Sequence, residues 1–161
     1  MRALLAALLL SCAISAGADE FRVTLLGTGD PIPRTDRFGP ATLVQAGGQE
    51  LLFDVGRGAA TRLVQMGVAL SAIDATFITH FHHDHLIGLD DVWMTGWIPP
   101  PFGRRQIPME IYGPTGTENL LTSLEKAFEL NTSIRIPDEL LAPDGIKFNA
   151  HEFDSDGVVY E

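Results

Sequence analysis

Four of the five histidines of this 161-residue chain lie within six consecutive positions, in the segment Thr79-His80-Phe81-His82-His83-Asp84-His85. The segment follows the β-rich run 75–79 and precedes a stretch with helical spacing. Imidazoles two residues apart on an irregular turn project toward one point, and a carboxylate and another imidazole follow as the chain turns. This density at a strand end predicts a metal site with the ligands His80, His82, Asp84 and His85.

The chemistry of these side chains limits the choice of metal. Imidazole and carboxylate ligands suit zinc, and they also suit iron or manganese. A helix that begins near Asp84 and His85 would favour the ionised carboxylate and the neutral imidazole, which are the forms that bind metal. We interpret His83 as a neighbour of the ligands. A histidine-rich surface loop is the alternative without function, and the position of all four histidines between a strand and a helix argues against it.

Alternating apolar and polar residues predict strands on both sides of this segment. Phe21, Val23 and Leu25 alternate with polar residues, and Gly47-Gly48 indicates a hairpin between two further strands. The other expected strands are residues 41–46, 50–55, 75–79, 109–112 and 148–153. Strands that lead into helices predict an α/β protein, and the hairpin favours a mixed sheet over a purely parallel one.

Helical spacing predicts three helices. The first covers residues 58–66 and stops at Gly67, and the second covers residues 86–93. The third opens with the capping box Thr115-Gly116-Thr117-Glu118 and carries apolar residues up to Phe128. Residues 131–161 are expected to form short strand-like pieces and turns.

The first eighteen residues differ from the rest of the chain. Arg2 precedes an apolar run from Ala3 to Leu10, and Ala16-Gly17-Ala18 supplies the small residues that a signal peptidase reads. We therefore expect a signal peptide at 1–18, a mature domain at 19–161, and export to the periplasm or the medium. Cys12, the single cysteine, also allows a lipoprotein anchor, although the residues before it fit that pattern poorly. In either case the mature domain holds no disulfide.

Composition excludes some classes of protein. Apolar residues make up 45% of the chain and charged residues 20%, which is typical of a globular protein. The formal net charge is −10, which argues against broad electrostatic attraction to nucleic acid.

The pattern His80-x-His82-x-Asp84-His85 matches the signature of the metallo-β-lactamase superfamily. Two earlier segments, Leu25-Leu26-Gly27-Thr28-Gly29 and Leu52-Phe53-Asp54-Val55-Gly56, resemble elements of its ribonuclease Z and arylsulfatase-like branch. The segment Ile111-Tyr112-Gly113-Pro114 resembles a later strand and turn of the same branch. The resemblance covers residues 21–130 approximately, in the correct order.

The resemblance implies an αββα sandwich with a two-metal site at the edge of its sheets. It places His80 and His82 on the first metal ion and Asp84 and His85 on the second, with Asp54 beneath them as an orienting residue. A hydroxide that bridges the metals would attack the substrate, and Asp84 would also handle a proton. A turn residue at a strand end is the plain alternative for Asp54.

One departure from the family pattern affects the whole site. Family members carry three further ligands downstream, a histidine, an aspartate and a final histidine, whereas this chain has only His151 after the motif. We expect His151 to be a surface residue of a strand. We therefore interpret the chain as the N-terminal portion of a longer protein, which alone would hold half a site and would not be an active hydrolase.

Residues 93–106 are rich in aromatics and prolines and end with Arg104 and Arg105. They are expected either to form a wall or lid over the metals, with the arginines meeting a substrate phosphate or sulfate, or to be a surface insertion with solvated arginines.

Three functions remain open. The first is a zinc-dependent hydrolase of phosphodiester or sulfate-ester bonds, and export favours a small substrate over transfer RNA. The second is a β-lactamase or another hydrolase of small esters or amides. The third is a non-catalytic metal-binding protein. A two-iron redox enzyme is disfavoured, because that branch usually places a glutamate where His82 stands. Association into a homodimer is a further expectation.

Overall fold

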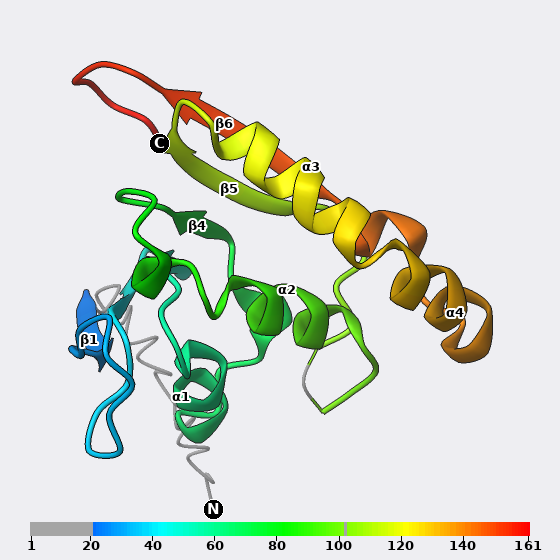
Figure 1. Ribbon diagram of the computed structural model, residues 1–161. Helices are drawn as coiled ribbons and strands as arrows, with labels where there is room; N and C mark the ends of the chain where they lie inside the picture. The colour runs from blue at the N-terminus through cyan, green and yellow to red at the C-terminus, as the bar shows by residue number, and fades with distance from the viewer. Residues whose placement is uncertain (1–20, 102) are drawn as a thin grey trace, which may run out of the picture.

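The computed structural model describes residues 21–101 and 103–161, which form one six-stranded sheet with helices against it (Figure 1). The strands are β1 (Arg22–Gly27), β2 (Ala41–Ala46), β3 (Gln49–Phe53), β4 (Ala75–Phe77), β5 (Met109–Pro114) and β6 (Phe148–Phe153). The predictions of a signal peptide and of an anchor at Cys12 lie outside the described residues.

The strands follow one another across the sheet in the order of the sequence. β1, β2 and β3 pair antiparallel, whereas β3 to β6 pair parallel, so the prediction of a mixed sheet is confirmed. Gly47 and Gly48 make the turn between β2 and β3 with φ values of 58° and 78°. A two-residue hairpin turn of this kind needs positive φ at both positions, which glycine adopts without steric cost.

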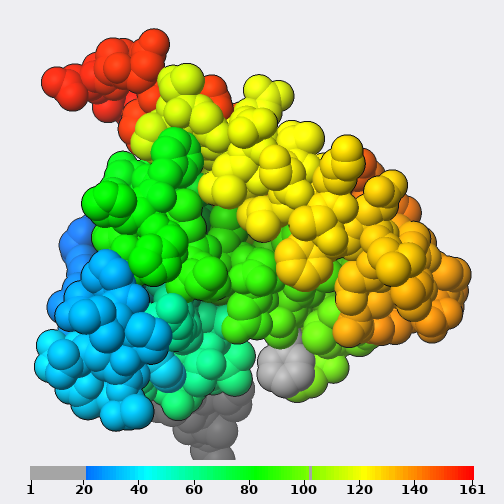
Figure 2. Space-filling view, in the orientation of Figure 1, coloured from blue at the N-terminus to red at the C-terminus, as the bar shows by residue number. Residues whose placement is uncertain are grey.

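Helices cover one face of the sheet. They are α1 (Ala59–Gln65), α2 (Leu89–Trp97), α3 (Thr117–Ala127) and α4 (Glu129–Glu139), with short 3-10 turns at Leu70–Ala72, His83–His85 and Pro143–Ile146. Figure 1 shows α3 in front of β5 and β6, and Figure 2 shows the yellow-to-orange residues of α3 and α4 as one continuous side of the surface. No helix among the described residues is long and apolar enough to cross a membrane.

The core lies between this face of the sheet and the helices. Strand residues Leu43, Leu52 and Ile111 are completely buried, and they belong to one apolar cluster with Leu63 of α1 and Trp93 of α2. Each fully buried side chain of this size contributes roughly 1.5–3 kcal/mol to folding. This packing fixes the carboxyl ends of β3 and β4, where the histidine segment begins.

The opposite face of the sheet carries a row of rings. The paired positions Phe53, Phe77, Tyr112 and His151 cross four parallel strands, with ring centroids 4.6, 5.1 and 4.3 Å apart. The described residues thus form one sheet with helices on one side, which is the arrangement of one half of an αββα sandwich. The α/β prediction is confirmed.

Two predictions about helices are wrong. Residues 129–139 form the helix α4, where strand-like pieces and turns were expected. The capping box at residues 115–118 does not form, because Gly116 occupies the N-cap and no side chain of the helix caps it. The carboxylate of Glu152 on β6 instead accepts hydrogen bonds from the backbone N–H groups of Gly116 and Glu118, both at 2.9 Å.

The expectation of a wall or lid at residues 93–106 is wrong, and the alternative of a surface insertion with solvated arginines holds for Arg104 only. Trp93 and Trp97 are fully buried core residues of α2, and Figure 1 shows the following loop at the far end of α2 from the histidine turn. Arg105 neither faces a substrate nor lies in solvent: it is buried and donates to the carbonyl oxygens of Gly145 (3.0 Å) and Trp93 (2.6 Å). Arg104 is exposed and donates to the carbonyl oxygen of Leu140 at 3.3 Å.

Candidate metal centre

Two neighbouring parallel strands bring the parts of the site together. Phe53 at the end of β3 pairs with Phe77 at the end of β4, so the residues that follow each strand lie side by side. Asp54 follows β3 with a φ of 57°, in the left-handed region, where aspartate is one of the few residues tolerated. Its backbone N–H donates to the carbonyl oxygen of Phe77 at 2.8 Å. This turn directs the Asp54 carboxylate toward the segment that leaves β4.

The Asp54 carboxylate connects both ends of the histidine segment. Its Oδ1 accepts the backbone N–H of Thr79 at 2.9 Å, and the Thr79 hydroxyl lies 3.0 and 2.9 Å from the two carboxylate oxygens. Its Oδ2 lies 2.7 Å from Nδ1 of His85. With only 7% of Asp54 exposed, these partners replace the water that the buried carboxylate has lost.

Three imidazoles gather above Asp54. The ring of His80 lies 4.6 Å from that of His82 and 4.2 Å from that of His85, centroid to centroid. The Thr79 hydroxyl lies 2.9 Å from Nδ1 of His80. Nδ1 of His85 faces Asp54. The other ring nitrogen of His85, Nε2, faces Asp84 and lies 3.8 Å from its Oδ2. The structure therefore brings His80, His82 and His85 together with Asp84 close beside them.

Asp84 is the most deeply buried polar member of the group. It is 4% exposed, and its Oδ1 has no hydrogen-bond partner among the described residues. A buried carboxylate oxygen without a partner is costly unless a cation or a donor satisfies it. The His83 side chain is exposed, as expected of a neighbour of the ligands.

The local backbone differs from the expected helix start. Residues His83–His85 form one 3-10 turn, and α2 begins only at Leu89, so the proposed help from a helix N-terminus at Asp84 and His85 is wrong. The turn is held by the backbone instead: Val55 N–H donates to the carbonyl oxygen of His85 at 2.7 Å, and Gly88 N–H donates to that of Val55 at 2.9 Å.

Sequence reasoning missed Thr79 and Gly88. Thr79 had a signal, because it comes two residues after Phe77, the partner of Phe53, and neighbouring parallel strands bring the residues after their carboxyl ends close together. Gly88 had none in the sequence: a Cβ at this position would lie 2.4 Å from the carbonyl oxygen of Gly56, so only glycine lets the two segments approach.

The donor set fits part of a metal site. In the described part of the chain, no three histidine, cysteine, aspartate or glutamate side chains are arranged so that they could hold a metal ion. The chemistry nevertheless suits zinc: clustered imidazoles, a carboxylate oxygen without a partner among the described residues, and a histidine oriented by a second carboxylate. That His80, His82, Asp84 and His85 bind metal stays a prediction.

His151 does not join this group. It lies on β6, is exposed, stacks on Tyr112 at 4.3 Å and has its Nε2 2.6 Å from the Glu110 carboxylate. The prediction that it is a strand residue at the surface is confirmed. A cavity of about 430 Å³ lies elsewhere, lined by residues such as Trp93, Lys126 and Lys147 and by none of the histidines.

Known proteins resemble the chain in sequence. The family model described as "Anti-Pycsar protein Apyc1" matches residues 21–131. A protein named ribonuclease Z from Mycobacterium marinum is 42% identical over 141 residues, which are 86% of this chain and 49% of that protein. The chain thus spans about half the length of the curated relatives that it matches.

Solved structures resemble it in fold. The short form of human tRNase Z superposes with a TM-score of 0.60 at 30% identity, covering 81% of this chain and 44% of that one. A long form RNase Z from yeast has a TM-score of 0.61 at 15% identity, with coverages of 91% and 20%, and supports the fold alone. By the match over residues 21–131 and by these likenesses, the chain belongs to the Apyc1 family, within the ribonuclease Z branch of the metallo-β-lactamase fold.

Proposed function

We propose that the chain contributes His80, His82, Asp84 and His85 to the two-zinc site of a phosphodiester hydrolase. One observation carries the proposal: the 2.7 Å contact between His85 Nδ1 and Asp54, with the Asp84 Oδ1 buried and without a partner nearby. Metal-binding histidines in proteins usually donate their second ring N–H to a carboxylate or carbonyl oxygen, which fixes the tautomer and turns the other nitrogen toward the metal. Asp54 has this relation to His85.

The chain's own residues have separate roles in this proposal. Asp54 orients His85 and, through Thr79, anchors the start of the histidine turn. Asp84 would bind metal through its carboxylate and would also handle a proton during the reaction. A bound zinc pair supplies water activation and neutralises the negative charge that develops on the substrate. Iron or manganese would fit the same donors.

The substrate class follows from the relatives. The matched proteins are named ribonuclease Z or tRNase Z, and phosphodiester cleavage is therefore the reaction that we propose. The comparisons do not support the charge argument against nucleic acid, so RNA belongs among the substrates to be tested. A sulfate ester and a β-lactam are the other candidates. Export and homodimer formation stay predictions.

Zinc binding by this chain tests the site directly. Competition with a chromophoric chelator measures zinc affinity for the unaltered chain, for His82→Ala and for His83→Ala. We expect His82→Ala to lower the affinity at least tenfold, because one imidazole ligand is lost. His83→Ala is the matched control. The His83 side chain is exposed and is not among the proposed ligands, so this variant should bind zinc as tightly as the unaltered chain does. Equal affinity in all three proteins would refute the assignment of ligands.

Hydrolysis tests the reaction. The assay uses the full-length protein, because this chain spans about half the length of its curated relatives. The substrates are bis(p-nitrophenyl) phosphate, a precursor transfer RNA, p-nitrophenyl sulfate and nitrocefin, each with added zinc. Turnover of the first two that is lost in His82→Ala and kept in His83→Ala supports a phosphodiesterase. Zinc binding without turnover of any substrate supports a metal-binding protein, and turnover of nitrocefin alone supports a β-lactamase.

A further inference from the structure

The row of rings lies directly beneath the candidate metal centre. Phe53 precedes Asp54 in the chain, and Phe77 comes two residues before Thr79. Tyr112 pairs with Phe77 on the next strand, and the three rings stack at 4.6 and 5.1 Å. The rings therefore mark the carboxyl ends of β3, β4 and β5, where the site is built.

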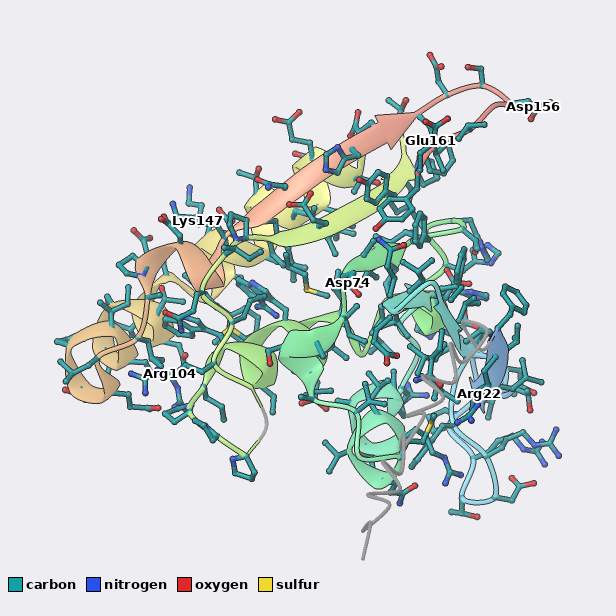
Figure 3. All side chains as sticks on the ribbon, turned by 180° about the vertical axis from the view of Figure 1, so that it is seen from behind. Arg22, Asp74, Arg104, Lys147, Asp156 and Glu161 are labelled. Carbon is teal, nitrogen blue, oxygen red and sulfur yellow. The ribbon has the colours of Figure 1, made fainter. Side chains whose placement is uncertain are left out.

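Tyr160 returns to this row from the far end of the chain. Its ring meets Phe77 edge-on at 5.5 Å and Tyr112 edge-on at 5.3 Å. Its hydroxyl accepts a hydrogen bond from Nε2 of Gln49, at the start of β3, at 2.8 Å. Figure 1 shows the segment after β6 turning back toward β4 and β5, and Figure 3 shows Glu161 beside the carboxyl end of β5. One side chain thus contacts β3, β4 and β5.

The two rings that Tyr160 touches belong to residues that anchor the site through their carbonyl oxygens. The carbonyl oxygen of Phe77 accepts the N–H of Asp54 at 2.8 Å, and that of Tyr112 accepts the N–H of Ile78 at 2.7 Å. Asp54 in turn contacts Thr79 and His85. A short path of contacts therefore leads from Tyr160 to the histidine turn.

We propose that Tyr160 is a positioning residue whose ring clamps β4 and β5 together near their carboxyl ends, beneath the histidine turn. The inference rests on the proposed function for its link to zinc. Phe77 is only 8% exposed on the face of the sheet that the helices do not cover, and the edge-on ring of Tyr160 is a contact that shields it. Edge-on aromatic contacts are directional, so they oppose sliding of the strands past one another. They also exclude water from the ring surfaces that they cover.

Amide hydrogen exchange tests the clamp without any metal. We expect Tyr160→Leu to speed exchange of the Asp54 and Ile78 amides roughly tenfold, since two aromatic contacts are lost. The internal reference is the Val92 amide, which donates to the carbonyl oxygen of Gly88 at the start of α2. Its exchange rate should change less. Tyr160→Phe keeps the ring and should remain close to the unaltered protein. Val158→Ala changes an exposed residue of the same segment and is the matched control.

The outcomes separate the possibilities. Faster exchange confined to Asp54 and Ile78, with rescue by phenylalanine, supports the clamp. Unchanged exchange in Tyr160→Leu overturns the clamp. An equal increase at the Asp54, Ile78 and Val92 amides also overturns it, because that result indicates general destabilisation.

Zinc affinity provides the second measurement. A several-fold lower affinity in Tyr160→Leu, with Tyr160→Phe and Val158→Ala unchanged, supports the link to the site, and equal affinity in all variants overturns that link. If neither the unaltered chain nor any variant binds zinc, the proposed function fails, and hydrogen exchange still decides whether the clamp exists.

Discussion

Asp54 and Arg105 are both charged side chains that lie almost wholly inside the protein, with 7% and 6% exposed. Asp54 is surrounded by a hydroxyl, a backbone N–H and an imidazole, all of which belong to the histidine segment. Arg105 donates to two backbone carbonyl oxygens, and within the described part of the chain its Nη1 has no hydrogen-bond partner and no carboxylate pairs with it. Burial lowers the pKa of Arg105 to about 10.

The difference shows how to separate functional from structural burial of charge. Asp54 organises side chains that can themselves bind a ligand, whereas Arg105 joins α2 to the 3-10 turn before β6 through main-chain oxygens. Trp93 and Trp97 strengthen the same junction, since their indole N–H groups donate to the carbonyl oxygens of Ile146 and Ala142 at 3.0 and 2.9 Å. Asp54 is therefore expected to affect the site, and Arg105 the stability.

The largest expected effect on folding is at Arg105. Arg105→Met leaves two buried carbonyl oxygens without their donors, which we expect to lower the free energy of unfolding by about 2 kcal/mol after relief of the buried charge. Urea denaturation measures this change. Arg104→Met, at an exposed neighbour, should stay within about 0.5 kcal/mol. A more stable Arg105→Met protein would show that the buried charge opposes folding by more than its hydrogen bonds stabilise it.

Asp54→Asn is expected to act mainly on the site. The amide keeps the size of the side chain but cannot accept from both Thr79 and His85 as a carboxylate does, so stability should fall by only about 1 kcal/mol. Zinc affinity should fall roughly 10- to 100-fold, the usual effect of losing a carboxylate that orients a metal-binding histidine. Asp74→Asn, at an exposed aspartate that accepts the Glu50 N–H, is the control. Unchanged zinc affinity in Asp54→Asn would make Asp54 a turn residue only.

The smallest expected effect concerns the ionisation of the Tyr112 phenol, in the row of rings. Burial, with smaller contributions from Glu110 and Tyr160, raises the pKa of Tyr112 above its ordinary value of 10.0. The folded protein therefore holds this proton more tightly than the unfolded chain, so this contribution to stability is present below pH 10 and is lost as the pH rises through the higher value. Ultraviolet titration of the phenolates should show a late step that Tyr112→Phe removes. A protein without that step would contradict the raised pKa.

The strands and the gathering of the histidines could be predicted from the sequence because each has a local signal. Alternation predicted β1, Gly47-Gly48 predicted the hairpin, and the spacing of the histidine segment predicted which side chains gather. The family resemblance placed Asp54 beneath the site but did not name His85 as its partner, and nothing in the spacing of two residues 31 positions apart indicates that contact.

Other features had signals that were weak or absent. The helix α4 buries none of its residues and contains Pro137, so neither periodicity nor composition favoured a helix there. Glu152 caps α3 from 34 to 36 positions away, which a search for a local capping box cannot find. In the sequence, Arg105 resembled a surface arginine. Its burial depends on close packing against Gly96 and Gly145, which only folding brings next to it.

The strand order has a consequence for how this protein is made. Because β1 to β6 lie across the sheet in the order of synthesis, each strand that leaves the ribosome finds its partner already at the growing edge. None of the six described strands waits for a later one to be inserted between two others, so this sheet can extend in one direction as translation proceeds. Once β5 has left the ribosome, β3, β4 and β5 bracket the histidine turn, and Tyr160 reaches the ring-bearing face after β6, the last of the described strands.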